Sequence, residues 1–183
     1  MRKLVCIIEI LLLLFFAFGC ADDEPILYGP YDVAKVVDGD TIRVMIDGEE
    51  TKVRMIGIDT PESVHADKSK NTEEGTLASD RVKELLLEKS VYLEYDVSAE
   101  DHYGRMLAYV YLEDGETMIE RVLLSEGLAT IMTVQPNSKY EDEFYNIQKK
   151  AREEELRKQR EEQKKKEEEE KKRIEEEEKK RIE

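Results

Sequence analysis

The sequence has 183 residues with 44 Asp or Glu and 29 Lys or Arg, which gives a formal net charge of −15 at pH 7. This balance argues against a protein that gathers polyanions over a broad basic surface. With only two cysteines, the chain cannot be a scaffold held together by several disulfides.

The first 19 residues have the features of an export signal. Arg2 and Lys3 form a positive start, an apolar run covers residues 7–18, and small residues precede Cys20. The run is short for a membrane span. We therefore predict a signal peptide over residues 1–19 and an exported protein.

Cys20 is the predicted lipidation site. Residues 17–20 (Ala-Phe-Gly-Cys) resemble a lipoprotein box, and after processing Cys20 would be the only cysteine, so it could not form an internal disulfide. Ordinary cleavage after Gly19, giving a secreted protein, is the alternative. The acidic segment 20–29, with Pro25, is then expected to be a tether between a membrane and the domain.

The pattern of the middle segment, residues 30–140, predicts one compact α+β domain. Residues 31–37, 41–46 and 51–58 have the β-branched enrichment of strands, and Asp47-Gly48 is a hairpin turn signal between the second and the third. A polar loop is expected over 62–72. Further on, the periodicity predicts helices over 76–89 and 118–126, strands over 91–97 and 106–112, and a third helix from about Ser138.

The last 43 residues, 141–183, are nearly all Glu, Lys, Arg and Gln. Glu residues precede Lys or Arg by four positions, the favourable orientation for helix ion pairs. Ile174 and Ile182 do not supply the apolar repeat that a coiled coil needs. We expect a charged single helix or a partly disordered tail rather than a zipper.

Two carboxylates come at neighbouring strand ends. Asp40 follows the Asp38-Gly39 turn and opens the second strand, and Asp59 closes the third. Adjacent strands lie ~4.8 Å apart, so the two side chains would repel each other unless a cation lies between them. Calcium, which takes ~6–8 oxygen ligands, suits such a pair.

Three segments carry a resemblance to the staphylococcal nuclease (thermonuclease) family. They are Val37–Thr41, Arg54–Glu62 and Asp101–Arg105, and the resemblance extends over roughly Tyr31 to Asn137. It implies a five-stranded OB-fold Greek-key barrel with three helices, the last extended by the charged tail. It also implies a calcium-dependent phosphodiesterase that hydrolyses DNA and RNA at the 5′ P–O bond and leaves 3′-phosphates.

The resemblance assigns roles to individual residues. Asp40 and Asp59 would bind calcium through their carboxylates and Thr60 through its backbone carbonyl. Glu62 would be the general base, since a carboxylate there can take a proton from the attacking water. Arg54 and Arg105 would stabilise charge on the phosphate, and Tyr103 would contact the substrate's terminal phosphate.

The sequence departs from the family where its substrate-stacking tyrosines would align, near Thr133 and Gln135. Neither is aromatic, and base stacking is worth ~1–3 kcal/mol per base. Residues 21–140 also hold 26 acids and only 12 bases. We therefore expect weak non-specific binding with a shallow salt dependence, in which Arg54, Arg105 and the metal capture the substrate.

Two other classes of function remain open from the residues alone. One is a non-catalytic OB-type module that binds nucleic acid or protein at the cell surface, and the other is a surface scaffold that works through its charged helix. The complete set of Asp40, Arg54, Glu62 and Arg105 favours the enzyme. The chain is expected to be a monomer.

Overall fold

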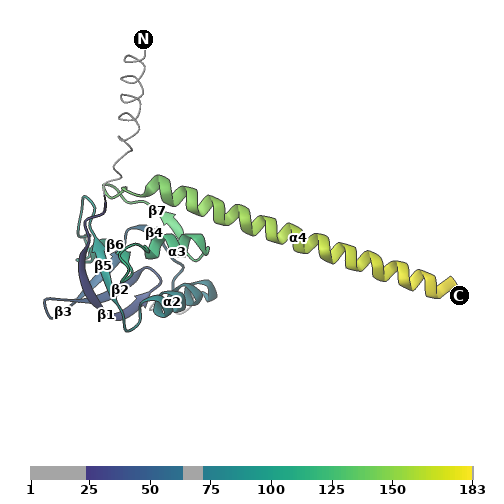
Figure 1. Cartoon of the computed structure of the whole chain (residues 1–183), viewed down its shortest axis with the longest axis horizontal. Helices are drawn as coiled ribbons and strands as arrows, with labels where there is room; N and C mark the ends of the chain where they lie inside the picture. The colour runs from purple at the N-terminus through teal and green to yellow at the C-terminus, as the bar shows by residue number, and fades with distance from the viewer. Residues whose placement is uncertain (1–23, 64–71, 183) are drawn as a thin grey trace, which may run out of the picture.

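The computed structural model describes residues 24–63 and 72–182, which form a small barrel and a long helix that projects from it (Figure 1). Five strands close the barrel in the order β1-β2-β3-β6-β5. Only β3 and β6 run parallel to each other. The strands are β1 (Tyr28–Asp38), β2 (Thr41–Ile46), β3 (Glu49–Met55), β5 (Ser90–Glu94) and β6 (Met106–Tyr111).

Three helices accompany the barrel in the described residues: α2 (Glu73–Leu86), α3 (Ile119–Ser125) and α4 (Glu141–Ile182). The α+β barrel with three helices, the last one long, confirms the predicted fold class. The first helix begins three residues earlier than expected, because the Thr72 side chain caps it by accepting from the amide of Gly75 at 2.9 Å.

The prediction of one continuous third strand over residues 51–58 is wrong, because this segment contains the end of one strand and the start of another. The backbone turns at Gly57, whose φ of +81° is readily adopted only by glycine. Beyond it, β4 (Gly57–Asp59) leaves the barrel and pairs with β7 (Thr130–Met132). The sequence pattern missed β7, which has only three residues.

The hydrophobic core continues past residue 140, into the segment that the sequence analysis assigns to the tail. Phe144, in the first turn of α4, is 1 % exposed and packs near Tyr109 and Gly57. Ile147 is partly buried against the same core. The start of the long helix is therefore part of the domain.

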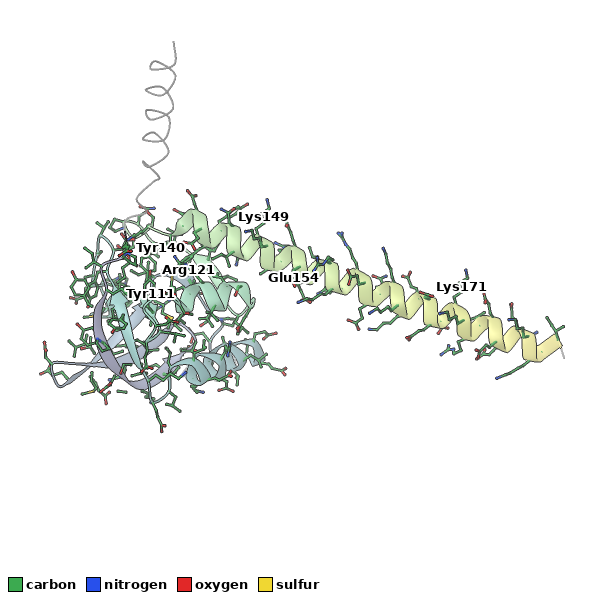
Figure 2. All side chains as sticks on the ribbon, in the orientation of Figure 1. Tyr111, Arg121, Tyr140, Lys149, Glu154 and Lys171 are labelled. Carbon is green, nitrogen blue, oxygen red and sulfur yellow. The ribbon has the colours of Figure 1, made fainter. Side chains whose placement is uncertain are left out.

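A buried carboxylate fastens this helix to the barrel. Glu94, at the end of β5, is 2 % exposed; it pairs with Lys139 and accepts hydrogen bonds from the hydroxyls of Tyr111 (2.7 Å) and Tyr140 (2.9 Å). Figure 2 shows Tyr111, Tyr140 and Arg121 where α4 meets the barrel. We call Glu94, Tyr111, Lys139 and Tyr140 the helix-docking cluster.

The rest of α4 is a solvated single helix. Every residue of 152–182 is exposed, and its charges pair with one another, as in Glu162–Lys166 at 2.7 Å and Glu168–Lys172 at 3.0 Å. Figure 2 shows its side chains projecting all around the axis. In the part of the chain that the structure describes, no helix is long and apolar enough to cross a bilayer.

Several predictions concern residues outside the described ranges or at their edge. The signal peptide of residues 1–19 and the lipidation site Cys20 lie outside the described residues, as does most of the loop predicted over 62–72. Of the expected tether, residues 24–27 have no regular structure, and its last two residues already belong to β1.

Candidate active site

Arg54, on β3, holds the candidate site together. Its Nη2 lies 3.1 Å from Oδ2 of Asp40 and 2.9 Å from Oδ1 of Asp59, so one nitrogen touches both carboxylates. Its Nη1 donates to the carbonyls of Met55 (2.7 Å) and Ile58 (2.8 Å), where the chain bends out of the barrel. A cation in an apolar strand is costly without partners, and these contacts supply them.

Asp40 is 8 % exposed and orders the residues around it. Its Oδ1 accepts from the hydroxyl of Thr41 at 2.8 Å, and its Oδ2 accepts from the backbone amide of Thr60 at 3.1 Å. Gly39 allows this approach, since a Cβ at that position would lie 2.7 Å from the hydroxyl oxygen of Thr60. The turn before β2 and the segment after β4 are thus locked together.

Asp59 is the more accessible of the two acids, with its side chain 52 % exposed. Partial burial raises its pKa above the ordinary value; the charge of Asp40 acts in the same direction, and Arg54 opposes both. The two carboxylates repel each other, and only the positive charge of Arg54 between them relieves that repulsion in the described residues. A second cation at this place would relieve it further.

The donors fit a hard cation. One oxygen of Asp40 and one of Asp59 lie within 3.1 Å of the same Arg54 nitrogen, and calcium accepts carboxylate, backbone carbonyl and water oxygens together. Within residues 24–63 and 72–182 no group of three or more His, Cys, Asp or Glu side chains is arranged to hold a metal. Two carboxylates alone would therefore have to be completed by a backbone carbonyl, such as that of Thr60, and by water.

Glu62 lies on the segment that leaves this cluster. Its side chain is exposed, and its backbone carbonyl accepts from the amide of Thr72 at 2.9 Å. Gly75 in the first turn of α2 makes room for it, because a Cβ there would lie 2.3 Å from that carbonyl oxygen. The start of α2 therefore fixes the backbone at Glu62 relative to Thr60.

Arg105 and Tyr103 belong to a tight turn before β6. Asp101 accepts from the amides of Tyr103 and Arg105, both at 2.9 Å, and its Oδ2 lies 2.7 Å from Nε of Arg105. Burial acts to raise the pKa of Asp101, but these hydrogen bonds outweigh it and lower the pKa. Sequence reasoning gave Asp101 no role; its position four residues before Arg105 was the available signal.

The parallel pairing of β3 and β6 brings the two halves of the site together. Val53 pairs with Met106 and Arg54 with Leu107, so Arg105 lies beside β3 and close in register to Arg54. Lys52, Tyr103, Gly104 and Arg105 line a shallow pocket there. Tyr103 is 71 % exposed, and the guanidinium of Arg105 lies 5.4 Å from its ring centre.

Six of the predicted residues thus lie in two adjoining groups. Direct contacts join Asp40, Arg54, Asp59 and Thr60. Strand register places Arg105 beside Lys52, two residues before Arg54 on β3, and Tyr103 lines the same pocket. Glu62 follows the first group by two residues. At the positions without stacking tyrosines, Thr133 and Gln135, the exposed neighbours are Met132 and Val134.

Comparison with known proteins points to one family. The profile described as "Staphylococcal nuclease homologue" matches residues 52–158. A thermonuclease of Staphylococcus hyicus is 45 % identical over 121 residues, 66 % of this chain and 70 % of that protein. A thermonuclease of Staphylococcus intermedius is 42 % identical over 126 residues, 69 % of this chain and 73 % of its own length.

A third relative comes from another genus. The endonuclease YncB of Bacillus subtilis (strain 168) is 40 % identical over 124 residues, which are 67 % of this chain and 57 % of that protein. Residues 52–158 of that profile match include Arg54 on β3, the turn before β6 and the first turns of α4, whereas Asp40 precedes the match. The chain therefore belongs to the staphylococcal nuclease family.

Proposed function

We propose that this chain is a nuclease of the micrococcal type, a hydrolase that uses calcium to cleave the phosphodiester bonds of DNA and RNA. The observation that carries the proposal is the contact of one Arg54 nitrogen with both Asp40 and Asp59. Phosphate and a divalent cation need such a cluster, with fixed positive charge beside paired carboxylates. The thermonuclease and endonuclease relatives support the same chemistry.

In this proposal the arginines act on the phosphate. Both Arg54 and Arg105 are already oriented by carboxylates, at 2.9 Å and 2.7 Å, so little motion is required when the phosphate arrives. Their guanidinium groups donate to the non-bridging oxygens, where negative charge grows as water attacks phosphorus. Asp101, which orients Arg105, is a positioning residue rather than a catalytic one.

Glu62 takes the proton of the attacking water, since it is the acid that follows the cluster directly and its backbone is fixed by α2. Asp40, Asp59 and the carbonyl of Thr60 would hold the calcium ion, which supplies charge neutralisation for the phosphate. Attack on the face opposite the 5′ oxygen breaks the 5′ P–O bond and leaves a 3′-phosphate. Tyr103 contacts the terminal phosphate of the bound strand.

We also propose that the mature protein is a cell-surface lipoprotein attached through Cys20. Only residues 21–27 separate this cysteine from β1. Seven extended residues span at most about 25 Å, so the barrel would stay close to the membrane surface. Replacing Cys20 by Ser should release the protein into the soluble fraction, and equal membrane retention would contradict lipidation.

A cleavage assay tests the proposed reaction. Purified protein is incubated with end-labelled DNA and RNA, with calcium or with a chelator, and the product ends are analysed. The proposal requires cleavage of both substrates with calcium only, and 3′-phosphate products. Products that carry only 5′-phosphates would contradict the mechanism, and intact substrates in every condition would contradict the function.

A further inference from the structure

Four basic side chains form a row across neighbouring strands of the barrel. Lys35 on β1 pairs with Arg43 on β2, and Arg43 pairs with Lys52 on β3. On the other side of β3, Met106 pairs with Val53, so Arg105 lies next to Lys52, and the two line one pocket. We call Lys35, Arg43, Lys52 and Arg105 the basic row.

The row lies on the outer face of the barrel. Residues paired directly across two strands share a face, and successive residues alternate between the faces. The neighbours of Arg43 and Lys52 along their strands, Ile42, Val44 and Val53, are fully buried. Lys35 is exposed, and the side chain of Arg43 is 42 % exposed, so both are open to a ligand in solution.

Acidic neighbours leave most of this charge available. Glu50 lies 3.3 Å from Arg43 with both side chains about half exposed, and such pairs contribute little. Asp101 holds Arg105 in the orientation already described. Among the described residues no ion pair is formed by Lys35 or Lys52.

The row also concentrates positive charge in a domain that is acidic as a whole. Residues 21–140 contain 12 bases against 26 acids, and four of those bases are in this row. Its last member, Arg105, belongs to the site, and Arg54 follows Lys52 by two residues on the same face of β3. The positive charge therefore leads directly to the place where the phosphate is expected to react.

We propose that the basic row is a track for the backbone phosphates of the nucleic-acid strand that enters the site. The proposal deepens the nuclease function and rests on it. The row spans three inter-strand spacings, ~14 Å, which suits consecutive phosphates of one strand rather than a single anion. It replaces the expectation from composition that capture depends only on Arg54, Arg105 and the metal.

The test compares two triple variants with the same change in net charge. The row variant carries Lys35→Gln, Arg43→Gln and Lys52→Gln, and it leaves Arg105 in place. The control variant carries Lys83→Gln, Lys89→Gln and Lys149→Gln, three exposed lysines of α2, its following turn and α4. Binding of a labelled single-stranded oligonucleotide is measured by anisotropy in chelator, across a range of salt.

Each phosphate contact contributes about 0.7 to the slope of log affinity against log salt for a single strand. The salt slope of the row variant should therefore be smaller than that of the wild type by about 2. If the affinities of the two proteins become equal near 1 M salt, the row variant should bind about a hundredfold more weakly at 0.1 M salt. The control variant should keep the wild-type slope. Glu50→Gln, which frees Arg43, should strengthen binding. Equal affinities and slopes for the row and control variants would overturn the proposal.

Cleavage kinetics separate failure of the track from failure of the nuclease function. With calcium, the row variant should lose kcat/KM on a 20-nucleotide strand and keep most of it on a dinucleotide, which is too short to extend from the site to Arg43 and Lys35. If the wild type cleaves both substrates and the row variant cleaves them equally well, the track is wrong and the nuclease function stands. If the row variant binds the long strand more weakly but the wild type cleaves nothing, the track stands and the proposed function is wrong.

Discussion

The domain contains two clusters of charged side chains with opposite designs. In the helix-docking cluster the carboxylate of Glu94 is buried and contacts one ammonium and two hydroxyls. In the site, Asp40 and Asp59 both contact Arg54, their one cationic partner among the described residues, and Asp59 is half exposed. The first cluster is satisfied within the protein, whereas the second keeps two negative charges together near solvent.

The difference indicates what each cluster is for. A buried polar group with all its partners stabilises one packing arrangement, here the start of α4 against the barrel. Two partly compensated carboxylates cost stability, and such groups are retained where a ligand supplies the missing charge. Changes in the first cluster should therefore affect folding, and changes in the site should affect catalysis.

The largest expected effect is on turnover. Arg105→Ala and Glu62→Ala should each lower kcat by roughly 10²–10³-fold, the usual loss when one preorganised charged group is removed from a site. Both side chains are on turns outside the core, so the melting temperature should change little. Steady-state kinetics with Arg152→Ala on α4 as the control measure this, and near-normal turnover in both variants would exclude the assigned roles.

The next largest effect is on stability. Glu94→Gln removes the charge that pairs with Lys139 and leaves one acceptor for two tyrosine hydroxyls, which should cost about 2 kcal/mol of unfolding free energy. Urea denaturation measures this, with Glu153→Gln on the exposed helix as the control. Activity per folded molecule should remain. If Glu94→Gln kept wild-type stability and lost activity, the helix-docking cluster would serve catalysis rather than folding.

A third prediction concerns pH. Burial raises the pKa of Glu120 to about 8, against hydrogen bonding from the amide of Val110. The protonated form is favoured in the fold, so this contribution to stability is complete below the unfolded pKa near 4.5 and is lost as the pH rises through 8.

Glu120→Gln removes the titration. The stability of this variant relative to the wild type should therefore increase between pH 5 and pH 8, by at most about 1.4 kcal/mol per pH unit. Urea denaturation at several pH values provides the measurement. A constant difference between the two proteins over that range would show that Glu120 does not titrate.

The smallest effect is expected for the distal helix. Removing residues 161–183 should change neither kcat nor the melting temperature measurably, because the described part of this segment is fully exposed and pairs only with itself. Removal from Tyr140 onward should instead unfold the domain, since it deletes Phe144 and part of the helix-docking cluster. A loss of activity in the shorter deletion would show that the distal helix contacts the working domain.

The sequence predicts the features that depend on local pattern. The β-branched runs and the Asp47-Gly48 turn predict β1, β2 and the presence of β3 but not its end before Gly57, and the charged repeat predicts the distal helix. The candidate site residues could be named through the resemblance of their motifs to the family, and their roles stay predictions. The contact of one Arg54 nitrogen with both acids is visible only in the folded structure.

Features that depend on register could not be read in this way. The members of the basic row are separated by eight, nine and 53 positions, and only the pairing of β1, β2, β3 and β6 aligns them. In the sequence Glu94 is one acid among 26 in residues 21–140, and only packing places two tyrosines and a lysine against it. The three-residue strand β7 exists because β4 offers it an edge.

A calcium titration of the cleavage rate tests the central claim most directly, namely that Asp40 and Asp59 are kept close together to receive a cation. Wild type, Asp59→Asn and the control Asp142→Asn, an exposed acid of α4, are compared at saturating substrate. Asp59→Asn should need at least tenfold more calcium for half-maximal rate, while the control should match the wild type. An unchanged calcium requirement in Asp59→Asn, or full activity of the wild type in chelator, would contradict this claim.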